Sequence, residues 1–166
     1  MFDTPQDGAS RVAFGLPMVG PEPTTMATIG FNGGGEEGSR YRLLLVDPYG
    51  HSREGLGAAL RGGGVLVETA EGASQAMAVM QAGEVDLAIV DLDLPPTHGL
   101  AEDGWDLVHL LRTASPTLPL ILIAAESRPH TQDEALRLGA RLLEKPINPR
   151  ELRTIVRALR PETAPA

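Results

Sequence analysis

The segment of residues 85–96, VDLAIVDLDLPP, constrains the fold of this chain more than any other stretch. Its first half is almost continuously apolar, which is typical of a parallel strand covered on both faces. Asp91 stands where such a strand would leave the sheet, and open α/β sheets place their ligand sites at that end of the strands. An aspartate before a turn is also common for purely local reasons, so the segment taken alone favours a structural role for Asp91.

Composition narrows the possible functions. The chain has 166 residues, 42% of them apolar, which is enough for one ordinary core. It contains no cysteine, and its four histidines lack metal-ligand spacing, so any bound metal would be held by oxygen atoms. The net charge of −8 disfavours bulk attraction to nucleic acid or to an anionic membrane. The first residues lack a secretory signal and no apolar run is long enough to span a bilayer, so we expect a cytoplasmic protein.

The chain divides by composition near residue 40. Residues 1–39 contain four prolines and the run GGG at 33–35, with no sustained apolar period. We expect them to form a disordered Gly/Pro-rich tail that is dispensable for folding. Residues 40–160 are predicted to form one domain, and residues 161–166 a disordered C-terminus.

Five strand patterns alternate with five helix patterns within the predicted domain. The predicted strands are residues 41–47, 65–67, 85–90, 120–125 and 141–143, and the predicted helices are residues 51–61, 73–82, 105–112, 131–138 and 149–159. Five such units in a row fit a doubly wound parallel sheet with right-handed crossovers. The sequence therefore predicts an α/β fold.

Three charged residues follow the first, third and fifth predicted strands. They are Asp47, Asp91 and Lys145, and Lys145 is the only lysine in the chain. Because the carboxyl ends of parallel strands meet at one edge of a sheet, we expect these side chains to converge. Two neighbouring carboxylates suit a hard divalent ion such as Mg²⁺, and a carboxylate can attack phosphorus to form an acyl phosphate. An ammonium group beside them can balance charge on a phosphoryl oxygen.

Residues 41–160 resemble the receiver domain of two-component response regulators. The motifs that carry the resemblance are VD at 46–47, REGL at 53–56, D-x-x-x-P at 91–95, LGA at 138–140 and KP at 145–146. The resemblance implies a flavodoxin-like five-stranded parallel sheet with strand order 2-1-3-4-5 and helices on both faces. It also implies a cis peptide bond between Lys145 and Pro146.

The resemblance further implies a bacterial signalling protein that is not an enzyme. In that family the aspartate after the third strand accepts a phosphoryl group from the phosphohistidine of a sensor histidine kinase or phosphotransfer protein. Asp91 matches this phosphoacceptor, Lys145 matches the lysine that contacts the phosphoryl group, and Asp47 and Asp91 match metal ligands for Mg²⁺. A downstream protein partner would bind through the last strand and helix, and neither nucleic acid nor a membrane is expected as a partner.

The sequence departs from the family pattern at several site positions. Pro48 stands where the family usually has a second acid, which predicts weaker Mg²⁺ binding. Ala124 replaces the hydroxyl residue at the end of the fourth strand, and Leu142 or Leu143 replaces the aromatic residue of the fifth, so the switch positions are degenerate. The loop after Asp91 holds extra residues. The family's P-x-x-x-G in it matches residues 95–99, or else its D-G matches residues 103–104 after an insertion.

Asp93 lies two residues after Asp91, where its carboxylate can border the site. It is predicted either to replace the metal ligand missing at Pro48 or to be a solvated loop acid. The arginines at 150, 153, 157 and 160 lie on one side of the last predicted helix, and a solvated basic face is the favoured interpretation.

Three functions remain open at this point. The first is a stand-alone receiver that is phosphorylated on Asp91, with weakened metal binding and switching. The second is a phosphorylation-independent pseudo-receiver that acts as a protein-binding module. The third is a haloacid-dehalogenase-like phosphatase with Asp91 as nucleophile and Asp93 as acid, although Leu94 departs from that motif and no cap domain follows.

Overall fold

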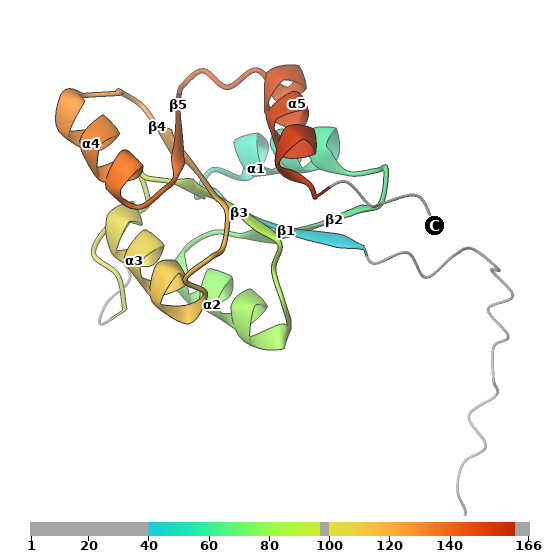
Figure 1. Ribbon diagram of the computed structural model, residues 1–166, viewed down its shortest axis with the longest axis horizontal. Helices are drawn as coiled ribbons and strands as arrows, with labels where there is room; N and C mark the ends of the chain where they lie inside the picture. Colours follow the sequence, from blue (N-terminus) through green and yellow to red (C-terminus); the bar gives the residue numbers. More distant parts are fainter. Residues whose placement is uncertain (1–39, 97–99, 162–166) are drawn as a thin grey trace, which may run out of the picture. The chain divides into compact units, whose positions relative to one another are not determined.

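The computed structural model describes residues 40–96 and 100–161. They form one parallel sheet of five strands in the order β2-β1-β3-β4-β5 (Figure 1). The strands are β1 (Tyr41–Val46), β2 (Val65–Ala70), β3 (Leu87–Asp91), β4 (Leu120–Ala124) and β5 (Arg141–Glu144). The predicted fold class and strand order are confirmed.

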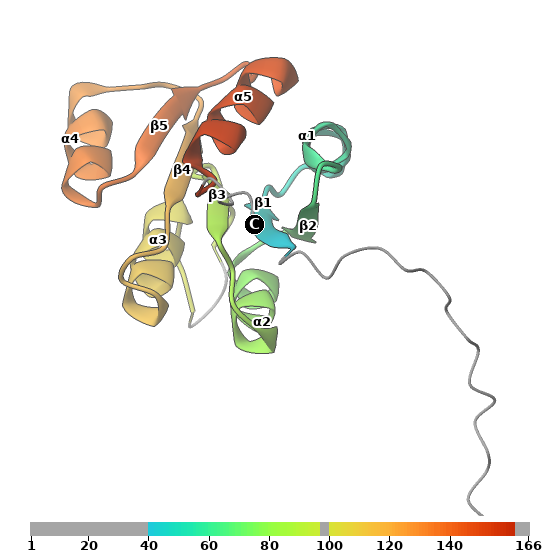
Figure 2. The same cartoon turned by 45° about the vertical axis from the view of Figure 1, so that its right-hand side comes forward.

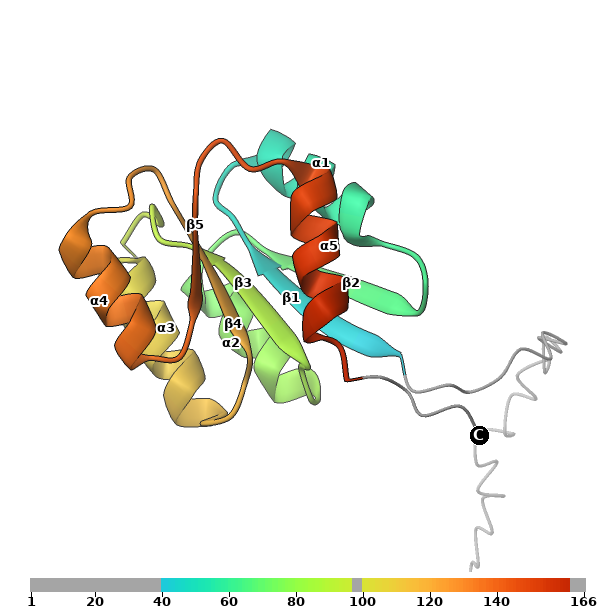
Figure 3. The same ribbon diagram turned by 45° about the horizontal axis from the view of Figure 1, so that its top comes forward.

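Five helices alternate with the strands and cover both faces of the sheet. They are α1 (Gly50–Leu60), α2 (Ala73–Ala82), α3 (Gly104–Ala114), α4 (Pro129–Arg137) and α5 (Pro149–Leu159). Helices α1 and α5 pack on one face, and α2 and α3 pack on the other (Figures 2 and 3). No helix among the described residues is long and apolar enough to cross a membrane.

The two faces have separate cores because successive strand residues point to opposite sides. Leu44, Val46 and Val90 belong to the core under α2 and α3, whereas Leu43, Leu45 and Ile89 belong to the core under α1 and α5. All five residues of β3 are buried, as are all five of β4. Such strands leave no solvated side, which is why charged groups of the central strands stand only at their ends.

Strand register fixes where the carboxyl ends of the strands lie. Val46 pairs with Val90, so Asp47 and Asp91 occupy the next positions on adjacent strands. Beyond β5, the backbone N–H of Lys145 donates to the carbonyl of Ala124 at 2.9 Å, which brings the lysine to the same edge. The peptide bond between Lys145 and Pro146 is cis, as predicted.

The first turn of α3 shows how Asp103 and Gly104 begin the helix after β3. Asp103 caps the helix by accepting a hydrogen bond from the backbone N–H of Asp106 at 3.0 Å. Gly104 follows, and a Cβ atom there would lie 2.5 Å from Cα of Leu92. Only glycine allows the helix to approach the β3 end so closely. This geometry is what the Asp103-Gly104 alternative expects, whereas Gly99 of the other alternative lies outside the described residues.

The predicted tail of residues 1–39 and the predicted C-terminal segment from residue 162 lie outside the described residues. The domain boundaries at 40 and 160 stay predictions.

Candidate functional site

Asp91 is buried at the end of β3, with 1% of its surface exposed. Its Oδ1 accepts a hydrogen bond from the backbone N–H of Asp93 at 2.9 Å, which fixes the carboxylate. Its Oδ2 lies 2.8 Å from Nζ of Lys145 and forms an ion pair with it. The structure thus brings together the two residues that the sequence analysis assigned to phosphoryl transfer.

Lys145 forms a second ion pair, with Asp93. Its Nζ lies 2.9 Å from Oδ2 of Asp93, so one ammonium group bridges two carboxylates. The same Nζ lies 5.6 Å from the centre of the Tyr49 ring, which adds a cation–π contact. Asp93 is thus a partner of the lysine through a partly exposed carboxylate. Its assignment as a metal ligand or as a solvated loop acid stays a prediction.

Asp47 is also buried, with 2% of its surface exposed. Its Oδ1 accepts from the backbone N–H of Tyr49 at 2.8 Å, and its carbonyl accepts from Nη1 of Arg53 at 2.6 Å. Asp47 and Lys145 line a pocket of about 430 Å³ whose wall also includes Pro146 and residues of α1.

Burial and the neighbouring opposite charges act in opposite directions on the pKa values of Asp91 and Lys145. Burial raises the pKa of the Asp91 carboxyl above its usual value, although the hydrogen bond and charge of Lys145 oppose that effect. Burial lowers the pKa of Lys145, but its bonds to Asp91 and Asp93 outweigh burial, and the net pKa is raised. Lys145 is therefore charged at neutral pH and available to balance negative charge on an oxygen beside Asp91.

The donor set for a divalent cation is small. The described residues contain no group of three or more acidic or histidine side chains arranged to hold a metal ion. Asp47 and Asp91 supply the hard oxygen donors that Mg²⁺ prefers, and Pro48 supplies none. The Oδ2 of Asp91 is paired with Lys145 at 2.8 Å, and a carboxylate oxygen has further lone pairs with which it can also bind a cation. Asp47 and Asp91 therefore fit a hard divalent ion, with one carboxylate fewer than a site that has a second acid at the position of Pro48.

The two switch positions lie on one face of the sheet. Ala124 ends β4, and Leu142 pairs in register with Leu122 and packs against the core under α2 and α3. Leu143 packs against the opposite core. Of the two leucines predicted as alternatives for the aromatic position of the fifth strand, Leu142 is therefore the one on the same face of the sheet as Ala124. Ala124, Asp93 and Trp105 line a cavity of about 380 Å³ beside the site. Neither Ala124 nor Leu142 carries a polar side-chain atom.

Two site residues were missed by sequence reasoning. Tyr49 contacts the ammonium of Lys145 through its ring, and nothing in the sequence around it signalled that contact. Arg53 was noted only as part of a motif. In the structure its Nη1 donates to the carbonyl of Asp47, and its Nη2 donates to Oε1 of Glu71 at 3.0 Å. These two bonds hold the loop after β1.

Comparison with known proteins finds one family and relatives that are regulatory proteins. The family model of the response regulator receiver domain matches residues 43–157. Over 119 residues the chain is 32% identical to the transcriptional regulatory protein CusR of Escherichia coli, which covers 71% of this chain and 50% of that protein. It is 33% identical over 113 residues to the alginate biosynthesis transcriptional regulatory protein AlgB of Pseudomonas syringae, covering 68% and 24% respectively. The chain therefore spans half or less of these curated relatives.

Solved structures agree with the sequence relatives. The chemotaxis protein CheY4 of Vibrio cholerae superposes with a TM-score of 0.64 at 26% identity, covering 74% of this chain and all of that one. A CheY-like receiver domain protein of Methanospirillum hungatei gives a TM-score of 0.63 at 26% identity, with 73% and 94% covered. With the family model matched over most of the described residues, the chain belongs to the response regulator receiver domain family of two-component signalling.

Proposed function

We propose that the chain accepts a phosphoryl group on Asp91 from the phosphohistidine of a sensor histidine kinase or phosphotransfer protein. One observation carries the proposal: the buried carboxylate of Asp91 lies 2.8 Å from the ammonium of the only lysine in the chain. The pocket beside Asp47 and Lys145 gives the donor its approach.

The reaction follows from the geometry of these side chains. An oxygen of the Asp91 carboxylate attacks the phosphorus atom, a P–O bond forms and the P–N bond to the imidazole breaks. The imidazole leaves and takes up a proton, and Asp91 carries an acyl phosphate. Lys145 moves its charge from the carboxylate to a phosphoryl oxygen, which lowers the free energy of the negatively charged transition state. When bound by Asp47 and Asp91, Mg²⁺ supplies further charge neutralisation.

Weak metal binding and weak switching are part of the proposal. Pro48 removes one carboxylate from the cation site, and Asp93 is engaged by Lys145, so Mg²⁺ should bind less tightly than in receivers with two acids after β1. Asp93 is kept as a candidate third ligand that would have to leave Lys145 first. Ala124 and Leu142 make no polar contact with a phosphoryl group, and a ligand shifts an equilibrium only by its differential interactions.

The pseudo-receiver is the second candidate, because Lys145 is already held by two carboxylates. In it, the ion pairs of Lys145 with Asp91 and Asp93 would stabilise the site without phosphorylation. In either case the output partner is proposed to bind at β5 and α5, where the edge strand β5 keeps Leu142 and Leu143 partly exposed. We place the protein in the bacterial cytoplasm as a signalling protein and not as an enzyme. Hydrolysis of a generic aryl phosphate would instead support the phosphatase alternative.

Phosphorylation is tested by treating the full chain with acetyl phosphate and Mg²⁺ and measuring intact mass. We expect one phosphoryl group in the wild type and in Asp133→Asn, which changes an exposed acid of α4. We expect none in Asp91→Asn. A wild type that stays unmodified while binding a protein partner would support the pseudo-receiver.

A further inference from the structure

A second pocket lies at the opposite edge of the sheet from Asp91. Its volume is about 560 Å³, within the range of roughly 300–1,000 Å³ that is usual for small-molecule sites. It is formed where α1 and α5 end and β2 begins, and its apolar wall comes from Leu60, Val65 and Val156. Figure 3 shows α1 and α5 side by side above this end of the sheet.

Four arginines line this pocket: Arg61, Arg153, Arg157 and Arg160. Among the described residues, no carboxylate lies within 4.0 Å of any of the four. Arg42 shows the contrast, because its Nη2 lies 2.6 Å from Oε1 of Glu68. Within the described part of the chain, the pocket therefore gathers positive charge without an acidic partner, although the net charge of the whole chain is −8.

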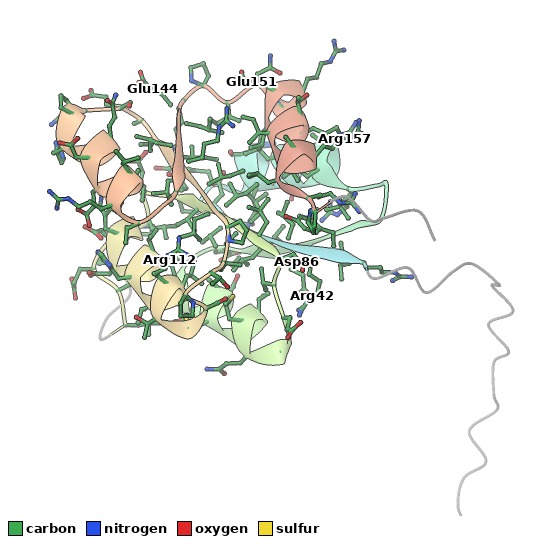
Figure 4. All side chains as sticks on the ribbon, in the orientation of Figure 1. Arg42, Asp86, Arg112, Glu144, Glu151 and Arg157 are labelled. Atoms are coloured by element: carbon green, nitrogen blue, oxygen red, sulfur yellow. The ribbon has the colours of Figure 1, made fainter. Side chains whose placement is uncertain are left out.

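Helix α5 contributes three of these arginines at spacings that bring them to one side. Residues three and four apart on a helix are neighbours, so like charges at 153, 157 and 160 repel one another. Glu151 is the only acid of this helix. Figure 4 shows Glu151 near the start of α5 and Arg157 near its end, so that acid does not compensate the pocket. An anion in the pocket would relieve the repulsion.

The turn before β2 contributes two glycines, Gly62 and Gly63, to the lining of the pocket. Gly62, Gly63 and Gly64 have φ angles of 104°, 60° and 79°, a left-handed conformation that other residues rarely adopt. The carbonyl of Gly63 accepts from Nη1 of Arg160 at 2.7 Å, and the same guanidinium stacks 5.2 Å from the centre of the Tyr41 ring. Arg160 is thus held in place before any ligand arrives, and Gly62 and Gly63 carry no side chain that would fill the pocket.

We propose that this pocket binds a small anion that bears two or more phosphate groups, such as a nucleoside polyphosphate. A guanidinium group binds phosphate oxygens through a pair of parallel hydrogen bonds. Four guanidinium groups around one cavity provide more positive charge than a ligand with a single carboxylate would neutralise. The apolar wall leaves room for an organic group attached to the phosphates. The site uses none of the residues around Asp91, so it is independent of the proposed phosphorylation.

Isothermal titration calorimetry of the full chain with pyrophosphate and with ATP, without Mg²⁺ and at low salt, tests the proposal. The double variant Arg153→Gln/Arg157→Gln should lose roughly tenfold or more in affinity, since each charged hydrogen bond contributes about that factor. Arg150→Gln is the control, because it removes a positive charge from the same helix outside the pocket. Asp91→Asn should bind as the wild type does.

NMR localises the effect, since the amide signals of residues 62–64 should shift on titration with pyrophosphate in the wild type and not in the double variant. The proposal is overturned if neither probe binds, or if Arg150→Gln loses as much affinity as the double variant. It is also overturned if only a single-stranded oligonucleotide binds, with an affinity that rises with length, because the arginines would then form a nucleic-acid surface.

Discussion

Replacing Gly104 by alanine should destabilise the domain, although alanine normally favours a helix. The added Cβ would lie 2.5 Å from Cα of Leu92, 2.7 Å from its carbonyl oxygen and 2.8 Å from its carbonyl carbon. All three are backbone atoms of the segment that joins Asp91 to Asp93, so no side-chain rotation relieves the clash. Overpacking of this kind costs about 1–3 kcal/mol. The better helix propensity of alanine returns at most about 1 kcal/mol.

We therefore expect a net loss of roughly 1–2 kcal/mol, which corresponds to a fall in Tm of several degrees. Urea unfolding followed by circular dichroism measures it. Gly55→Ala in α1 is the control with the opposite sign, because its Cβ meets no heavy atom within 4 Å and should gain about 0.5–1 kcal/mol. If Gly104→Ala were as stable as the wild type or more so, α3 would not begin against Leu92, and the Asp103-Gly104 alternative would lose its support.

Three further changes probe the site and its supports. Because burial raises the Asp91 pKa, the pKa of this carboxyl is higher in the folded than in the unfolded state. The protonated carboxyl therefore stabilises the fold in acid, and this stabilisation is lost as the pH rises through the folded-state pKa. Asp91→Asn should accordingly melt above the wild type at neutral pH, with the gap closing in acid; a gap that is constant across a pH series of melts would contradict this. Asp93→Ala removes one of the carboxylates that raise the Lys145 pKa, and an NMR titration should show that pKa falling; no change would argue against the bridge. Asp103→Ala removes the cap of α3 and should cost about 1 kcal/mol in urea unfolding, whereas a neutral result would mean that the hydrogen bond to the helix contributes nothing.

The fold was predictable because each strand and helix carries a local signal. The continuous apolar run of β3 and the amphipathic pattern of α5 are independent of the rest of the chain, and both elements lie where their patterns indicated. The second strand was predicted too short, ending at residue 67 where the structure continues to Ala70. This strand lies at the edge of the sheet, where Glu68 forms an ion pair with Arg42 of the neighbouring strand. The polar residues of β2 therefore do not end the strand.

The convergence of Asp91 and Lys145 was predictable from strand order, but the use of Asp93 was not. Two acids spaced by one residue are compatible with a metal, with solvent or with a lysine, and only the positions of the side chains show the ion pair. The same holds for the loop before α3. Its register depends on a contact between Gly104 and the backbone of Leu92, and no sequence pattern carries such a contact.

The central claim is that Asp91 is the residue that receives the phosphoryl group. The most direct measurement treats the full chain with acetyl phosphate and Mg²⁺, traps the acyl phosphate by borohydride reduction and maps the modified residue by tandem mass spectrometry. We expect the modification on Asp91 alone, because its carboxylate is the one that is buried and paired with Lys145. Modification of Asp93 or Asp47 instead, or no modification under conditions in which the protein remains folded, would contradict the account.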